Sequence, residues 1–212
     1  MADNLIEFTP SAYQYPLLVK HLLHYPMVHS PDQEIVYRDL RRHSYRVFRE
    51  RIGRLASGLS QVGVRPGDVV AVLDWDSHRY LECYFAVPMM GAVLQTVNLS
   101  LPPESLLYAM NDAAPSTVLV NADFLPLIEK MADKLPSVRN YVMLHDRKEQ
   151  PTTRLPIECE YEEMLRRIRH SSSFQISTRI PARRRFTPPA RRAARKASTS
   201  ATVSWCCIRS PS

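Results

Sequence analysis

Residues 69–98 read VVAVLDWDSHRYLECYFAVPMMGAVLQTVN, and this stretch decides the fold class. Val69 to Leu73 is a valine-rich apolar run too short for a helix, which is typical of a buried strand. A helix is expected from about Ser77 to Met90, followed by a stop at Gly91 and a strand from Ala92 to Val97. This order predicts two parallel strands joined by a crossover helix.

The same alternation continues on both sides of this stretch. Upstream, apolar residues recur at spacings of four and three along residues 48–62, on one helical face that Ser44 can cap and Gly63 can end. The other expected elements are strands at Glu34 to Tyr37 and His43 to Tyr45, a helix opened by Pro102 and Pro103, a strand at Thr117 to Val120, a helix around Phe124 to Leu135, a strand at Asn140 to Leu144, a loop after Asp146, and a short helix at Tyr161 to Arg169. The predicted fold class is α/β, with a mainly parallel sheet flanked by helices.

Charge is distributed unevenly along the chain. The whole sequence has 28 basic and 21 acidic residues, a net charge of +7. Residues 171–212 contain nine of the basic residues and no acidic one, so the preceding part is close to neutral. This tail is rich in proline, serine, alanine and arginine and has no helical or strand period. We therefore divide the chain into a partial domain at residues 1–170 and a tail at residues 171–212 that is predicted to be disordered.

Several classes of protein and site are not indicated. The sequence has no run of eighteen apolar residues and no signal-peptide pattern at its start, so we predict a cytoplasmic protein without a transmembrane segment. The four cysteines, Cys83, Cys159, Cys206 and Cys207, form neither a CxxC pair nor a framework, which favours isolated thiols. His21 and His24 could share a helical face, but they lack a third ligand nearby, and we predict no metal site.

The remaining candidate residues favour structural roles. Asp74 and Asp76 follow a predicted strand, at the edge where ligands gather in open α/β sheets. Capping of the next helix by Asp76 and Ser77 is the favoured alternative. The stripe of Tyr80, Tyr84, Phe85, Val87 and Met90 has helical spacing, which favours core packing over a substrate pocket. The five glycines never cluster into a phosphate-binding loop, and no GxSxG nucleophile elbow is present.

Three stretches carry a family resemblance: YPLLVKHLL at residues 15–23, SPDQEIVYRD at residues 30–39, and residues 54–113, which begin RLASGLSQVG and end LLYAMNDA. Together they closely resemble the AMP-forming acyl-CoA synthetases, in particular those for medium-chain and long-chain fatty acids. The likeness runs from about Tyr15 to Arg169 and is most specific at residues 69–98. It implies a partial amino-terminal subdomain of an adenylate-forming enzyme. Leu99 and Ser100 depart from the proline or valine and the basic residue that are common in the family.

The resemblance implies a two-step ligase. ATP and a fatty acid give an acyl-adenylate and pyrophosphate, and the thiol of coenzyme A then displaces AMP, with magnesium as the metal of the parent family. The family holds the ATP phosphates with a loop of the form TTGTTGxPKG. Neither this loop nor the later adenine, ribose and lysine segments match any segment of this chain. We therefore assign no catalytic, cofactor-binding or metal-binding residue here, and we predict that the chain is inactive.

The tail itself suggests where the missing loop lies. Codons compatible with Thr187 to Ala197 permit Thr-Thr-Gly-Thr-Thr-Gly-Arg-Pro-Lys-Gly when they are read in a neighbouring frame. The same shift permits VYFSHRQLVLH from Ala197 to Ile208 and PDFDENTRATTFY from Phe174 to Thr187. Each step constrains two of three bases, so a run of this length is hard to attribute to chance. We therefore hypothesise a frameshift near Ser173 or Phe174.

Two other functions remain open from the sequence. The basic tail could neutralise the phosphates of nucleic acid or an anionic surface, although Phe174, Phe186 and Trp205 lack the regular interleaving of a stacking platform. The partial domain could instead pair with an intact synthetase subunit, since proteins of this kind are often dimers. The acyl chain length of the parent's substrate stays open, and a short thioether acid such as methylthiopropionate is one alternative.

Overall fold

A computed structural model describes residues 18–146 and 151–168 of the protein. Its centre is a five-stranded parallel sheet with the strand order β4-β3-β5-β6-β7. The strands are β3 (Val69–Leu73), β4 (Val93–Thr96), β5 (Thr117–Asn121), β6 (Asn140–Leu144) and β7 (Ile157–Glu160). The predicted α/β class and the parallel sheet are confirmed.

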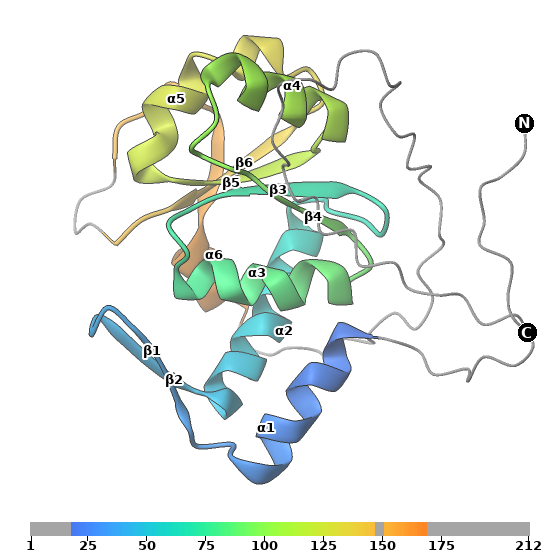
Figure 1. Ribbon diagram of the computed structural model, residues 1–212, viewed down its shortest axis with the longest axis vertical. Coiled ribbons are helices and arrows are strands. Elements are labelled where there is room, and N and C mark those ends of the chain that lie inside the picture. The colour runs from blue at the N-terminus through green and yellow to red at the C-terminus, as the bar shows by residue number, and fades with distance from the viewer. Residues whose placement is uncertain (1–17, 147–150, 169–212) are drawn as a thin grey trace, which may run out of the picture.

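Helices cover both faces of this sheet (Figure 1). The helices α2 (Tyr45–Gln61), α3 (His78–Met89) and α6 (Tyr161–Arg167) lie on one face, where Val70, Val72 and Leu119 are buried. The helices α4 (Pro103–Ala113) and α5 (Leu125–Glu129) lie on the other face, over Ala71, Val118 and Val120. Because alternate side chains of a strand point to opposite faces, a strand buried on both sides is apolar throughout, as β3 is.

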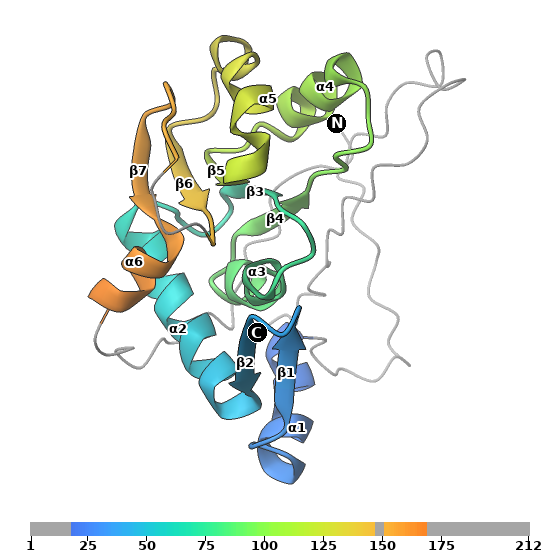
Figure 2. The same ribbon diagram turned by 90° about the vertical axis from the view of Figure 1, so that its left-hand side faces the viewer.

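A smaller unit precedes the sheet. The 3₁₀ helix η1 (Val19–Leu23) leads into α1 (His24–His29), and β1 (Glu34–Tyr37) pairs antiparallel with β2 (Arg41–Ser44). Figures 1 and 2 show this hairpin beside α2 and α3, away from the sheet. The hairpin therefore reaches the rest of the protein through the same two helices that cover one face of the sheet.

Glycines end α2 and α3 as the sequence predicts. Gly63 has φ +99°, its amide donates to the Ser60 carbonyl, and the Val64 amide donates to the Leu59 carbonyl. Gly91 has φ +84° and is part of the same pattern at the end of α3. This left-handed closure satisfies the last carbonyls of the helix and turns the chain back toward the sheet. It fixes the start of β4 beside β3.

Two predicted elements differ from those in the structure. The strand predicted at His43 to Tyr45 is β2 at Arg41–Ser44, because the Ser44 side chain caps α2 and Tyr45 is already helical. The single helix predicted at Phe124 to Leu135 is instead η2 (Ala122–Phe124), α5 and η3 (Ala132–Lys134). Short 3₁₀ and α turns also bury residues three or four apart, so the apolar spacing could not separate the two arrangements.

An unpredicted strand, β7, follows the loop predicted after Asp146. Its sequence is IECE, whose polar residues suit a sheet edge, and it pairs with β6 across a register shift at Tyr141/Val142. Four residues with two glutamates are too weak a local pattern to predict a strand, because this strand is stabilised by its pairing with β6. The short helix predicted at Tyr161 to Arg169 is confirmed as α6, while the tail at residues 171–212 lies outside the described residues.

Candidate functional site

The carboxyl ends of β3 and β5 form the point where the strand order reverses. From β3 the chain passes to β4 on one side and then crosses to β5 on the other. Asp74 follows β3 and is buried, and Asn121 ends β5. The Asn121 side-chain amide donates to Asp74 Oδ1 at 2.6 Å, and the Ser77 hydroxyl donates to Asp74 Oδ2. Asp74 therefore ties two strand ends to the start of α3.

The neighbouring aromatic residues close over this edge. The Trp75 indole N–H donates to Asp123 Oδ2 at 3.0 Å, and its ring centroid lies 4.7 Å from that of Phe124. Ser77, and not Asp76, caps α3, because its hydroxyl accepts from the amides of Arg79 and Tyr80. Asp76 is exposed with φ +22°. The residues predicted at this edge come together there, with helix capping and strand linkage as the roles their contacts define.

The aromatic stripe of α3 belongs to the core, as predicted. Tyr80, Val87 and Met90 are buried, and Tyr84 and Phe85 pack against the same cluster. Burial raises the pKa of the Tyr80 hydroxyl, with a further contribution from Tyr84. The stripe supports the sheet and forms no part of a described cavity.

A buried ion-pair network joins three helices that are distant in the sequence. Arg51 of α2 donates from Nε to Glu82 Oε1 of α3 at 2.6 Å, and from Nη2 to Glu162 Oε1 of α6 at 2.8 Å. The Tyr161 hydroxyl donates to Glu82 Oε2 at 2.6 Å. The Glu82 side chain is fully buried. Arg51, Glu82 and Glu162 are each hydrogen-bonded within this group, and these bonds offset the free-energy cost of removing the charges from water.

Arg79 extends the network to the end of β6. Its side chain is only 1% exposed, and it donates to Asp146 Oδ1 at 2.5 Å and to the His145 carbonyl at 2.9 Å. His78 Nε2 lies 3.3 Å from Glu162 Oε1. The segment after β6 is thereby held against the amino-terminal end of α3.

The network lowers the pKa of two of its acids. Burial alone would raise the pKa of Glu162, but hydrogen bonds from His78 and Arg51 and the charges of Arg51 and Arg79 hold it well below its usual range. The hydrogen bond from Arg79 likewise lowers the pKa of Asp146. Burial lowers the pKa of Arg51, yet its bonds to Glu162 and Glu82 outweigh this effect and raise it. The ion pairs are therefore formed at neutral pH.

The predicted metal candidates and a second histidine pair differ in their surroundings. His21 in η1 and His24 at the start of α1 are both exposed. In contrast, His43, His78 and Glu82 bring three donor atoms within 4.8 Å of one another. Sequence reasoning missed this trio because His43 is far from the others in the chain. A signal was present in the sequence of α3, which combines apolar residues with His78, Arg79 and Glu82. When such a helix is buried on most sides, its polar residues need partners.

The described cysteines are free thiols, as predicted. Burial raises the pKa of Cys83 well above its usual range, and burial followed by the charge of Glu158 raises that of Cys159 to about 11. Both thiols are therefore protonated and unreactive at neutral pH. Cys206 and Cys207 lie outside the described residues.

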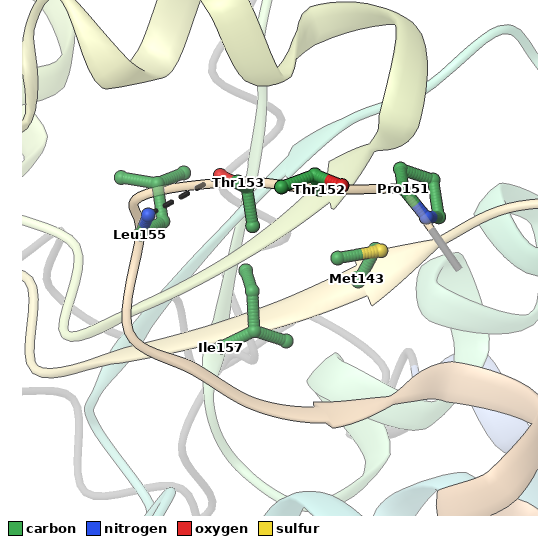
Figure 3. A pocket seen from close by; sticks show the side chains of 6 residues that line it. All are labelled: Met143, Pro151, Thr152, Thr153, Leu155 and Ile157. Carbon is green, nitrogen blue, oxygen red and sulfur yellow. Dashed lines mark hydrogen bonds between the residues drawn. The ribbon is translucent and has the colours of Figure 1, made fainter.

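An open groove lies beside the end of β6 (Figure 3). It is lined by Met143, Pro151, Thr152, Thr153, Leu155 and Ile157. The Leu155 amide donates to the Thr153 hydroxyl at 3.2 Å, and Figure 3 marks this bond. The lining has two hydroxyls and no titratable side chain. The Thr153 hydroxyl is engaged, because it donates to Glu129 Oε1 at 2.5 Å.

The fold and the strand-end edge define an open parallel α/β protein, the class whose ligands bind outside the carboxyl ends of the strands. Among the described residues, no helix is both long enough and apolar enough to cross a membrane. Residues 26–198 match the AMP-binding enzyme family, and the chain belongs to that family. The match continues past residue 170, where the composition changes.

The relatives that the chain matches include proteins named as acyl-CoA ligases. It is 38% identical over 109 residues to a long-chain-fatty-acid–CoA ligase of Thermus thermophilus, covering 51% of this chain and 20% of that protein. It is 30% identical over 154 residues to a 3-methylmercaptopropionyl-CoA ligase of Ruegeria lacuscaerulensis, covering 71% and 29%. The chain therefore spans between a fifth and three tenths of these relatives and is a partial member of the family.

A solved structure has the same fold over the matched region. A protein of Rhodopseudomonas palustris, described as a long-chain-fatty-acid CoA ligase, superposes with a TM-score of 0.60 at 25% identity. The matched region covers 71% of this chain and 36% of that one. The resemblance predicted from residues 15–169 is confirmed at the level of the family and the fold.

Proposed function

We propose that this chain is the amino-terminal part of an ATP-dependent ligase that activates a fatty acid as an acyl-adenylate and transfers it to coenzyme A. The observation that carries the proposal is the family match over residues 26–198, supported by relatives named as medium-chain and long-chain fatty-acid ligases. The relative named for 3-methylmercaptopropionate keeps a short thioether acid as the second candidate substrate.

The 212-residue chain alone is inactive in this proposal. Adenylation needs donors that neutralise charge building on the leaving pyrophosphate. Gly53 and Gly58 lie inside α2, and the other three glycines stand singly in turns. The strand-end edge carries Asp74, Asp76 and Asp123, whose charges would repel a triphosphate. The described residues therefore do not fit ATP, and no catalytic step is assigned to them.

The reading frame of the tail, residues 171–212, is the second part of this proposal. We propose that the phosphate loop is encoded in a neighbouring frame from about Ser173 onward, as the permitted codons indicate. The family match reaches residue 198 and so includes part of the tail, which a wrong reading frame alone does not explain. ATP, magnesium and coenzyme A are cofactors of the frame-restored protein in this account. The cytoplasmic location and the homodimer stay predictions.

A nucleic-acid-binding role for the tail is the second candidate, and nine basic residues without an acid favour it. Deletion of residues 171–212 distinguishes the two functions. A tail selected for binding would be needed for a cellular phenotype and for salt-sensitive binding to an oligonucleotide. A tail read in the wrong frame would leave the phenotype unchanged when removed.

ATP–pyrophosphate exchange tests the ligase proposal. The 212-residue chain is compared with the product of the same gene after the frame is restored and translation continues downstream, each with octanoate, palmitate and methylthiopropionate. We expect exchange only from the restored protein. Exchange by the 212-residue chain would overturn its inactivity, and a restored protein inactive with all three acids would overturn the ligase assignment.

A further inference from the structure

Two histidines and a glutamate meet where the β1–β2 hairpin packs against α3. One donor atom from each of His43, His78 and Glu82 lies within 4.8 Å of the others. His78 and Glu82 are four residues apart in α3 and so share one face of the helix. His43 comes from β2, and its ring centroid lies 5.7 Å from that of His78. Figure 2 shows the hairpin directly beside α3.

The hydrogen bonding of His78 leaves a nitrogen free to bind a ligand. With the Glu162 carboxylate as the acceptor, the contact at 3.3 Å places the hydrogen on His78 Nε2. In the neutral ring Nδ1 then carries a lone pair, and this atom is buried without a hydrogen-bond partner. The His78 side chain is only 3% exposed. A histidine that donates one N–H to a carboxylate and points the other nitrogen elsewhere has the usual arrangement of a metal ligand.

His43 supplies a second buried nitrogen. Its Nε2 is also buried and lacks a hydrogen-bond partner. A neutral His43 ring would offer this nitrogen as a metal ligand. Two neutral imidazoles and a carboxylate are a donor set that zinc-type ions prefer.

The surroundings of the trio hold charges of both signs. Glu82 and Glu162 lie there together with Arg51 and Arg79, which pair with them. A bound cation would give both unpartnered imidazole nitrogens a partner.

We propose that His43, His78 and Glu82 bind a divalent transition-metal ion of the zinc type, with water as the fourth ligand. A tetrahedral ion with bonds of about 2.0–2.1 Å holds its donors about 3.3 Å apart, so the side chains close slightly around it. The ion fastens the hairpin to α3 and acts as a structural metal. The sequence predicted no metal site because that reasoning compared only nearby residues, His21 and His24.

Metal titration of the full 212-residue chain tests this site. The protein is stripped with chelator and titrated with Co²⁺, whose absorption reports imidazole and carboxylate coordination, and bound Co²⁺ is then competed with Zn²⁺. We expect one ion per chain and a thermal midpoint raised by several degrees at a hundredfold excess over Kd. His43→Ala removes a half-buried ligand outside the ion pairs and should weaken binding by roughly tenfold or more. His24→Ala is the matched control and should bind as the parent does.

A second variant guards against misfolding. His78→Asn is compared with His43→Ala by circular dichroism, and both should retain the parent's spectrum while binding Co²⁺ more weakly than the parent. Absence of stoichiometric binding by the parent chain would overturn the proposal and leave water as the occupant of the space. Equal affinity in His43→Ala, equal loss in His24→Ala, or a thiolate-to-cobalt charge-transfer band would also overturn it.

Discussion

Replacing Glu82 with glutamine removes the fully buried negative charge that joins α2 to α3. The carboxylate accepts from Arg51 Nε at 2.6 Å, from Arg51 Nη2 at 3.3 Å and from the Tyr161 hydroxyl at 2.6 Å. The amide has one oxygen to accept with, and it places N–H donors against Arg51. Removing one member of a buried pair typically costs about 3–5 kcal/mol, because the remaining charge is left undercompensated. Glu162 still pairs with Arg51, which places the expected loss near the lower end of about 3 kcal/mol.

Urea unfolding followed by circular dichroism measures this loss. With a slope of about 2 kcal/mol per molar urea, the midpoint should fall by about 1.5 M. Glu50→Gln is the matched control, since Glu50 pairs with Arg54 on the exposed side of the same helix α2. Exposed pairs at this spacing contribute only about 0.3–0.5 kcal/mol. If Glu82→Gln costs no more than Glu50→Gln, the network does not stabilise the fold as argued.

Two further predictions concern acid stability and a turn. The lowered pKa values of Glu162 and Asp146 contribute stability that is present above the unfolded-state values of about 4 and is lost as pH falls toward the folded-state values. At pH values below 4 the urea midpoint of the parent should therefore decrease with pH, and the midpoint of Asp146→Asn should decrease less steeply. Parallel curves for the two proteins would contradict this assignment. Gly91→Ala should lower the free energy of unfolding by about 1 kcal/mol more than Gly63→Ala does, or the thermal midpoint by a few degrees more. Both glycines have positive φ, but only a Cβ at position 91 would approach Pro66 Cβ, at 3.2 Å. Equal losses in the two variants would show that Pro66 moves away freely.

Local patterns in the sequence predicted the elements whose stability is local. The valine run of β3, the apolar spacing of α2 and the glycine stops at Gly63 and Gly91 were sufficient, since strands, helices and their ends each have a characteristic period or closing residue. In contrast, β7 is four residues long and depends on pairing with β6, and η2, α5 and η3 share one apolar spacing that fits a single longer helix equally well.

The site was less predictable than the fold. Arg51 and Glu162 are 111 residues apart, and charged residues on helices usually face solvent, so no local period indicates that three helices converge on Arg51. The same holds for His43, which joins His78 and Glu82 only because the hairpin packs on α3. Asp74 and Ser77 were found because helix capping is a local signal, whereas the Asn121 partner of Asp74 depends on how the strands are ordered.

The nucleotide sequence of the gene across the codons for Ser173 to Ile208 distinguishes a tail read in the wrong frame from a natural one. A neighbouring frame that encodes a continuous Thr-Thr-Gly-Thr-Thr-Gly-Arg-Pro-Lys-Gly segment is the predicted result. A gene with no such segment in either neighbouring frame would mean that the tail belongs to this protein as it stands, and the proposed origin of its inactivity would be wrong.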